Sequence, residues 1–328
     1  MSVPDRAELL QIRDLTVTFP GPNGRVVVLD RVSFDVFGKE IVGLVGESGS
    51  GKTMTSLSVM RFLPAAGLVE GGVIVFKGED LLTSSETQMS QIRGRQIAMI
   101  FQSTRSALNP LMKVGDQVAR VYTTQRGLGP GQAKAEAVKA LSLMGIPDAE
   151  KRAAAYPHQL SRGMCQRVLI AMMVACEPDL LIADEPTTGL DVTIQAQIFE
   201  LIKDVQQATG ASILLITHDL GVVAETCERV VVMYAGQVME TAGVDSLFAN
   251  PMHPYTRRLL HSVLRVDKKA EMVEVDAGFS EEVTYAIKGC RFASRCPQVL
   301  PQCWDEHPVR VEVEPDHWVS CHNLDQRL

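Results

Sequence analysis

The chain has 328 residues, of which 46% are hydrophobic and 22% are charged, and its net charge is −7. This composition supports a well-filled core in one large domain or two, and it excludes global disorder. The negative charge argues against a protein that neutralises many nucleic-acid phosphates. It does not argue against nucleotide binding, because the phosphates of a single nucleotide need only a local binding site.

The sequence contains no predicted membrane or secretory segment. Its longest apolar runs, Ile213–Ile216 and Val230–Met233, fall far short of the roughly 18–20 residues that span a bilayer. The N-terminal sequence MSVPDRAELL has no basic stretch followed by an apolar one. We therefore expect a protein that stays in the cytosol.

The first hundred residues predict antiparallel β structure followed by a buried strand. Apolar and polar residues alternate over 9–19, and a turn at Pro20–Gly24 precedes a second strand region, Val26–Val36. Further strands are predicted at Ile41–Val45, Val73–Phe76 and Ile97–Phe101.

The character of the sequence changes at about residue 104. Residues 104–176 contain helical periodicity at Ala133–Met144 and Val168–Cys176, and we interpret them as an inserted helical subdomain. Strands and helices then alternate, which indicates an α/β fold with a mainly parallel sheet. These elements are the strands Leu180–Ala183, Ile213–Thr217 and Val230–Tyr234 and the helix Ile194–Gln207.

The segment Gly46–Thr53, GESGSGKT, lies between the strand Ile41–Val45 and a segment that can be helical, Thr55–Leu63. This is the context of a Walker A loop, in which backbone N–H groups and a helix N-terminus cradle phosphates. Lys52 is expected to reach the β- and γ-phosphates, and the Thr53 hydroxyl is expected to bind Mg²⁺. The predicted ATP-binding residues here are Gly46, Ser48, Gly49, Ser50, Gly51, Lys52 and Thr53.

Polar residues follow three of the predicted strands. Asp184 and Glu185 end a buried strand, where Asp184 is expected to hold Mg²⁺ and Glu185 to polarise the attacking water. Gln102 is expected to contact Mg²⁺ or that water. His218 lies at the carboxyl end of a strand, where ligands bind in α/β sheets, and is expected to reach the γ-phosphate.

Another candidate phosphate-binding edge is the segment Leu160–Arg167, LSRGMCQR, which precedes a helix. The Ser161 side chain is expected to cap that helix, leaving exposed backbone amides beyond it.

Taken in order, these motifs and Gly189-Leu190-Asp191 resemble the ATP-binding cassettes of ABC transporters over roughly residues 9–250. The resemblance implies a RecA-like P-loop NTPase core, and it assigns Phe19 to adenine stacking. Such cassettes work in pairs, so Ser161, Gly163 and Asp191 are expected to contact the partner chain's nucleotide in trans. ATP binding closes the pair, and hydrolysis reopens it.

A narrower resemblance is to the oligopeptide/dipeptide/nickel importer subfamily. It is carried by Phe101–Pro110, Tyr156–Leu160, Asp184–Gln197 and His253–Thr256. It implies a second cassette subunit, two transmembrane permeases, an extracytoplasmic solute-binding protein and no nucleic-acid partner. The expected location is the cytoplasmic face of the inner membrane, as a peripheral subunit. The implied domains are a cassette at 1–250 and a subfamily C-terminal domain at 251–328.

Two residues depart from the family's signature Leu-Ser-Gly-Gly and the Met-Arg-Gln-Arg that usually follows it in this subfamily. Arg162 replaces the first signature glycine and Cys165 replaces the usual arginine. Arginine brings a bulky side chain to a place where backbone approaches phosphate, whereas its charge would favour phosphate, so the direction of its effect stays open. By the resemblance this loop serves the partner's nucleotide, and we predict an asymmetric heterodimer in which this chain's own ATP is hydrolysed; a homodimer is the alternative.

The last 39 residues contain four cysteines, Cys290, Cys296, Cys303 and Cys321, with no Cys-x₂-Cys knuckle. In a reducing compartment such a cluster indicates metal binding rather than disulfides. Four thiolates and the Cys296-Pro297 step suit a [4Fe–4S] cluster, to which the subfamily resemblance also points. Zinc, with His317 or His322, and free thiols are the alternatives.

The sequence therefore predicts an ATP-hydrolysing subunit of an ABC importer for di- or oligopeptides or similar small solutes, with nickel chelates, opines and glycosides also compatible. The alternatives are a soluble ABC ATPase acting on nucleic acid or ribosomes, and a non-hydrolysing regulatory cassette. Neither a second cassette nor a long coiled-coil insertion is visible, and Glu185 and His218 argue against the regulator.

Overall fold

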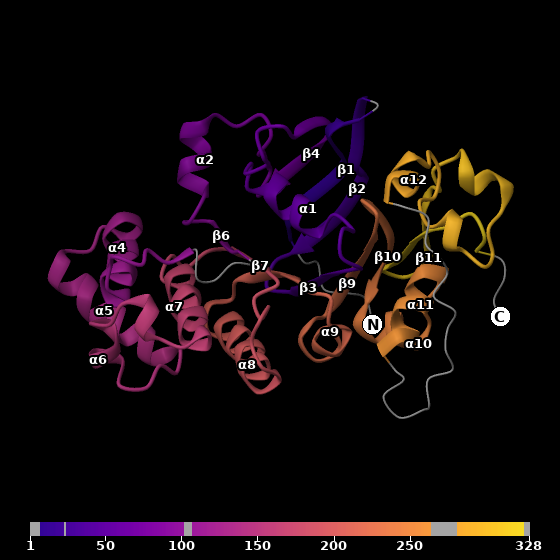
Figure 1. Cartoon of the computed structure of the whole chain (residues 1–328). Coiled ribbons are helices and arrows are strands. Elements are labelled where there is room, and N and C mark those ends of the chain that lie inside the picture. The colour runs from indigo at the N-terminus through magenta and orange to yellow at the C-terminus, as the bar shows by residue number, and fades with distance from the viewer. Residues whose placement is uncertain (1–6, 23, 102–106, 264–280, 325–328) are drawn as a thin grey trace. The chain divides into compact units, whose positions relative to one another are not determined.

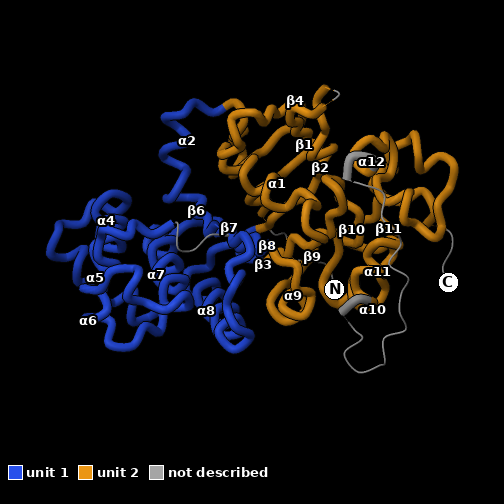
Figure 2. Tube along the Cα trace, viewed as in Figure 1, with its two compact units in different colours: residues 1–6, 38–40, 84–216 blue, residues 7–37, 41–83, 217–328 orange. Residues whose placement is uncertain are grey.

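The structure is a computed structural model that describes residues 7–22, 24–101, 107–263 and 281–324. These residues form two compact units (Figure 2). Of the described residues, unit 1 comprises 38–40, 84–101 and 107–216, and unit 2 comprises 7–22, 24–37, 41–83, 217–263 and 281–324. Gln102, predicted to contact Mg²⁺ or the attacking water, lies outside the described residues.

Unit 2 contains a four-stranded antiparallel sheet in the order β2-β1-β4-β5. Its long strands alternate buried and exposed positions, and Leu10, Ile12, Val17 and Phe34 are fully buried on one face. This is the period of two expected for a sheet that covers a core on one side. The strands are β1 (Glu8–Gly21), β2 (Gly24–Phe37), β4 (Leu68–Phe76) and β5 (Glu79–Asp80).

The glycine loop of unit 2 connects β3 (Ile41–Val45) to α1 (Lys52–Val59), and β3 pairs in parallel with β9 (Arg229–Tyr234). Every residue of β3 is buried, as is typical of a parallel strand covered on both faces. Beyond β9 the pairing turns antiparallel through β10 (Gln237–Gly243), β12 (His317–Ser320) and β11 (Arg310–Glu314). The C-terminal segment therefore adds two strands to this part of unit 2.

The strand β10 was not predicted, because its buried positions include Gln237, Glu240 and Thr241. Gln237 donates to the backbone oxygen of Gly289 at 2.9 Å, and Glu240 lies 2.7 Å from Nε2 of the buried His317. Burial raises the pKa of the Glu240 carboxyl, but hydrogen bonds led by His317 outweigh it and lower that pKa overall. The hydrogen-bonding groups of these buried polar side chains are paired with residues of the C-terminal segment. Because the side chains are polar, the sequence of β10 does not show the apolar pattern of a buried strand.

The remaining helices of unit 2 lie along the chain after residue 216. They are α9 (Leu220–Thr226), α10 (Val244–Ala249), α11 (Pro254–Val263) and α12 (Glu281–Ala286), with short 3₁₀ turns η2 (Ala293–Arg295) and η3 (Pro301–Trp304).

Unit 1 is built on three parallel strands, β6 (Ile97–Ile100), β7 (Leu180–Asp184) and β8 (Ser212–Ile216). Between β6 and β7 the chain forms consecutive helices, which group together in Figure 1. This group contains α4 (Val114–Arg126), α5 (Pro130–Leu143), α6 (Ala149–Ala153), η1 (Pro157–Gln159) and α7 (Arg162–Val174). The unit also contains α2 (Glu86–Ile92) and α8 (Val192–Thr209).

Side-chain caps fix where the two functionally interesting helices of unit 1 begin. The Ser161 hydroxyl accepts from the N–H of Met164 at 3.2 Å, and the Asp191 carboxylate accepts from the N–H of Ile194 at 3.0 Å. The predicted cap at Ser161 is thus present, and both caps satisfy N–H groups that the helix leaves unpaired.

None of the helices that the structure describes is long and apolar enough to cross a bilayer.

Candidate functional site

The loop Gly46–Thr53 in unit 2 has the backbone shape of a phosphate cradle. Gly46, Gly49 and Gly51 have positive φ angles of 154°, 77° and 101°. A Cβ atom at Gly46 would lie 2.1 Å from the backbone oxygen of Met233, so no larger residue fits there. The sequence needs glycine at this point because the loop passes directly against β9.

The Lys52 side chain folds back and donates hydrogen bonds to other residues of the same loop. Its ammonium group donates to the backbone oxygens of Gly46 at 2.8 Å and Glu47 at 2.9 Å, and to the Ser50 hydroxyl at 3.2 Å. The side chain is 6% exposed, so its charge is held inside the loop. A buried positive charge surrounded by neutral acceptors favours a negatively charged ligand beside it.

Residues from the C-terminal part of the chain contact this loop from outside. The Tyr255 hydroxyl accepts from the N–H of Glu47 at 2.9 Å, and the Tyr285 hydroxyl donates to the Gly49 oxygen at 2.6 Å. The Arg295 guanidinium pairs with the Glu47 carboxylate at 2.9 Å. Sequence reasoning does not predict these contacts. The one signal in the sequence is that the stretch His253–Thr256, which contains Tyr255, resembles the subfamily.

Two further predicted residues lie in unit 2 with the loop. Phe19, the predicted adenine-stacking residue, is half-buried at the end of β1, and its ring packs against Gly67. A partly exposed aromatic face of this kind is able to stack on a base. His218 is exposed and directly precedes Asp219, whose carboxylate caps α9.

Unit 1 carries the acidic pair. Asp184 is 2% exposed at the end of β7, and Glu185 follows it with a φ angle of 45°. The Glu185 N–H donates to the Ile216 oxygen at 2.9 Å, and the Thr188 hydroxyl donates to the Glu185 carboxylate at 2.9 Å. A non-glycine residue held in the left-handed region is typical of functional sites, where surrounding contacts maintain the strain.

The altered signature loop also lies in unit 1, where Ser161 and Arg162 are exposed and Gly163 is buried. The Arg162 guanidinium donates to the backbone oxygen of Gly189 at 3.3 Å. The side chain is therefore directed toward the segment before Asp191 rather than straight into solvent. Cys165, the other departure, is fully buried on α7.

A Cβ atom at Gly163 would lie 2.9 Å from the Ile194 side chain, so this glycine allows α7 and α8 to pack closely. The predicted site residues thus fall into two groups, one in each unit. Their assembly into a single ATP site stays a prediction, as do their individual roles.

The four C-terminal cysteines influence one another electrostatically. Burial raises the pKa of the Cys290 thiol to about 12, and the nearby sulfurs of Cys321, Cys303 and Cys296 act in the same direction. Burial likewise raises the pKa values of Cys296 and Cys321. All four thiols are free.

The sulfurs do not, however, form a ligand shell. Within the residues that the structure describes, no group of three or more His, Cys, Asp or Glu side chains is arranged to hold a metal ion. His317, one of the alternative zinc ligands, uses Nε2 to contact Glu240. The donor set thus suits a metal centre chemically, but the structure gives no support for an iron–sulfur or zinc site.

Comparison with protein families matches residues 29–188 to the ABC transporter model and residues 239–303 to the C-terminal region of oligopeptide/dipeptide transporters. A probable peptide ABC transporter ATP-binding protein of Sinorhizobium fredii is 46% identical over 98% of this chain and 96% of its own length. The dipeptide transport ATP-binding protein of Bacillus subtilis has the same identity and coverage.

The fold agrees with this relationship. A solved dimeric structure of the ATP-binding cassette MJ0796, bound to ADP and Pi, has a TM-score of 0.64 and 25% identity. The match covers 72% of this chain and 99% of that one. The predicted mixed α/β cassette fold and the predicted family are therefore confirmed: the chain belongs to the ABC transporter ATP-binding proteins of the oligopeptide/dipeptide subfamily.

Proposed function

We propose that this chain hydrolyses ATP to power the import of di- or oligopeptides through a membrane-embedded ABC transporter. The observation that carries the proposal is the phosphate cradle Gly46–Thr53, in a chain related over almost its whole length to peptide-transport ATP-binding proteins. Family membership favours this function over a ribosome-directed or purely regulatory cassette.

In the proposed mechanism the loop amides and Lys52 bind the ATP phosphates, and Phe19 stacks on the adenine. Thr53, Asp184 and Gln102 are the proposed Mg²⁺ ligands; when bound, this ion neutralises charge on the phosphates. Glu185 takes a proton from the attacking water, and His218 holds the γ-phosphate.

A second cassette subunit completes the proposed unit. Ser161, Gly163 and Asp191 of this chain would cover the nucleotide bound by the partner. The equivalent loop of the partner would cover the ATP bound by this chain. The dimeric form of the MJ0796 cassette supports such pairing. We propose that two permeases and a solute-binding protein complete the transporter and hold this subunit at the cytoplasmic face of the inner membrane.

The direct test is replacement of Glu185 by Gln in the transporter reconstituted with its partners in liposomes. Loss of the general base is expected to lower ATP turnover by about 100-fold or more, while nucleotide binding remains. Phosphate release and peptide uptake are the measurements. The matched control is Glu200→Gln on the exposed face of α8, and wild-type turnover in Glu185→Gln would refute the proposal.

The asymmetry proposal depends on Arg162. Its side chain occupies a position where the family's signature has glycine, and it contacts the Gly189 backbone. We expect that Arg162→Gly relieves the partner-held nucleotide site and raises total ATP turnover by up to about twofold, since one additional site becomes active. Single-turnover counting of both nucleotides checks this, and unchanged or reduced turnover would contradict an impaired second site.

We also propose that the four C-terminal cysteines bind a metal centre, for which a [4Fe–4S] cluster is favoured over zinc. The support is the four-thiol donor set without a Cys-x₂-Cys knuckle and the Cys296-Pro297 step of the sequence. Its role would be structural or redox-sensing, because ATP hydrolysis needs no redox chemistry.

Anaerobically purified protein is expected to absorb at about 400 nm and to contain iron and sulfide. Substituting Cys290→Ser should remove both signals. A colourless, metal-free sample would contradict any metal centre, whereas a colourless sample containing zinc would contradict only the cluster.

A further inference from the structure

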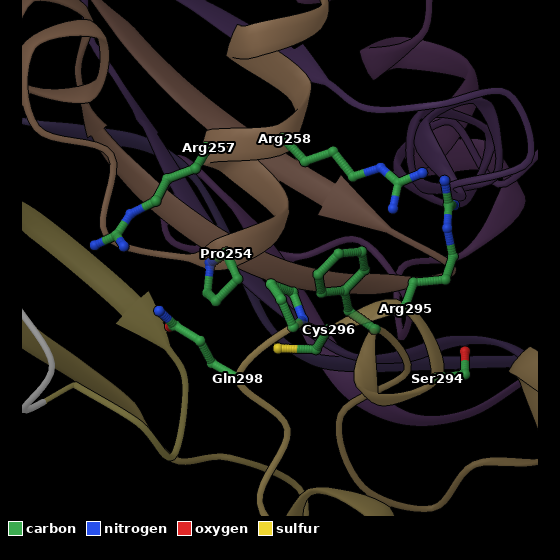
Figure 3. Close-up of a pocket in the computed structure, with 9 residues that line it drawn as sticks. Pro254, Arg257, Arg258, Ser294, Arg295, Cys296 and Gln298 are labelled. Atoms are coloured by element: carbon green, nitrogen blue, oxygen red, sulfur yellow. The ribbon is translucent and has the colours of Figure 1, made fainter. Parts of the chain in front are cut away.

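A pocket of about 430 Å³ lies in unit 2, between α11 and the turn that carries η2 (Figure 3). Its volume is within the range of small-molecule sites. None of its lining residues is acidic. They are Pro254, Arg257, Arg258, Phe292, Ser294, Arg295, Cys296, Pro297 and Gln298.

The pocket is strongly cationic in a chain whose net charge is −7. Figure 3 shows the guanidinium groups of Arg258 and Arg295 extending toward one another, while Arg257 extends to the other side. In the described part of the chain, neither Arg257 nor Arg258 has a carboxylate within ion-pair distance. Arg295 is paired with the Glu47 carboxylate, so the Arg258 guanidinium is the charge at this point of the pocket that lacks a counterion among the described residues. Such an uncompensated guanidinium beside a second one favours the binding of an anion.

Ser294 supplies an independent indication. Its hydroxyl oxygen is buried and has no hydrogen-bond partner among the described residues, although Ser294 lines the pocket. A buried hydroxyl without a partner is unfavourable, and a ligand oxygen that accepts a hydrogen bond from it would remove this cost. Arg257 already donates through Nε to the Pro251 oxygen at 2.8 Å, so its orientation is fixed before any ligand binds.

We propose that this pocket binds a small anionic molecule through a phosphate monoester or carboxylate group. Arg258 is its principal ligand, assisted by Arg295 and Ser294. Planar guanidinium groups match both anions in a bidentate manner. The side chains of Pro254 and Phe292 supply the apolar wall that a specific small-molecule site requires.

The same pocket communicates with the phosphate-binding loop. Arg295 is shared between the pocket and the Glu47 carboxylate, and Tyr255, on the helix that carries Arg257 and Arg258, accepts from the Glu47 N–H. An anion that draws Arg295 away from Glu47 loosens the outer wall of the loop. Anion binding and nucleotide binding therefore weaken one another, by the reciprocity of linked sites.

Binding is tested on the purified full-length chain with its loop saturated by a non-hydrolysable ATP analogue and Mg²⁺. Inorganic phosphate and succinate are titrated separately by calorimetry, which distinguishes a phosphate site from a carboxylate site. We expect one of them to bind, Arg258→Gln to weaken that binding tenfold or more, and Arg258→Lys to retain part of it. Arg120→Gln, an exposed arginine on α4, is the matched control and should bind as the wild type does.

Communication is tested by measuring the affinity of a fluorescent ATP analogue with and without the bound anion. The anion is expected to weaken nucleotide binding two- to fivefold in the wild type and to have no effect in Arg258→Gln. Glu47→Gln, which releases Arg295, should strengthen anion binding threefold or more. Binding of neither anion, or equal binding by Arg258→Gln, would overturn the site, and an unchanged nucleotide affinity would overturn the communication.

Discussion

The structure of unit 2 depends on a close contact between the backbone of Gly46 and that of β9. A side chain at Gly46 would collide with the Met233 oxygen, so the loop can follow its path only with glycine. Lys52 then bonds to the two carbonyl groups that the sharp turn leaves inside. These contacts within the chain hold the shape of the loop, and a loop held in its binding shape lowers the entropic cost of binding phosphate.

The C-terminal segment gives this loop a second layer of support. Arg291 is 2% exposed, and its guanidinium donates to the backbone oxygens of Ala235 and Val27. Val27 precedes the loop in the sequence and Ala235 follows it, so Arg291 joins two distant segments of unit 2. Tyr255, Tyr285 and Arg295 contact the loop itself. The C-terminal segment of unit 2 therefore packs directly against the loop Gly46–Thr53.

Local pattern was sufficient to predict β1 and β2, whose residues alternate between buried and exposed, and the parallel strands β3, β6, β7 and β8, which are short continuous apolar runs. The phosphate loop was also predictable, because its glycines and its lysine all lie within one stretch of eight residues, Gly46–Thr53. The strand β10 was not, because Glu240 and Gln237 are buried against residues more than fifty positions away. For the same reason no local signal reveals that Arg295 reaches Glu47, 248 positions earlier in the chain.

The direction of the Arg162 side chain is another feature that composition could not supply. Arginine in a signature loop predicts either obstruction or added charge, and the contact with the Gly189 oxygen depends on how α7 and α8 pack. For the four C-terminal cysteines, the sequence predicts the chemistry of the donors but not their arrangement in space. The donor chemistry is evident from four residues, whereas a ligand arrangement requires side-chain positions that the described residues do not adopt.

The central claim is that Gly46–Thr53 binds the phosphates of ATP through Lys52. The most direct measurement is an equilibrium titration of the purified chain with a fluorescent ATP analogue and Mg²⁺, comparing Lys52→Ala with the wild type. Lys134→Ala, an exposed lysine on α5, serves as the control. Lys52→Ala is expected to bind the analogue at least tenfold more weakly while its circular dichroism stays native. Equal affinity in Lys52→Ala and the wild type would contradict the claim.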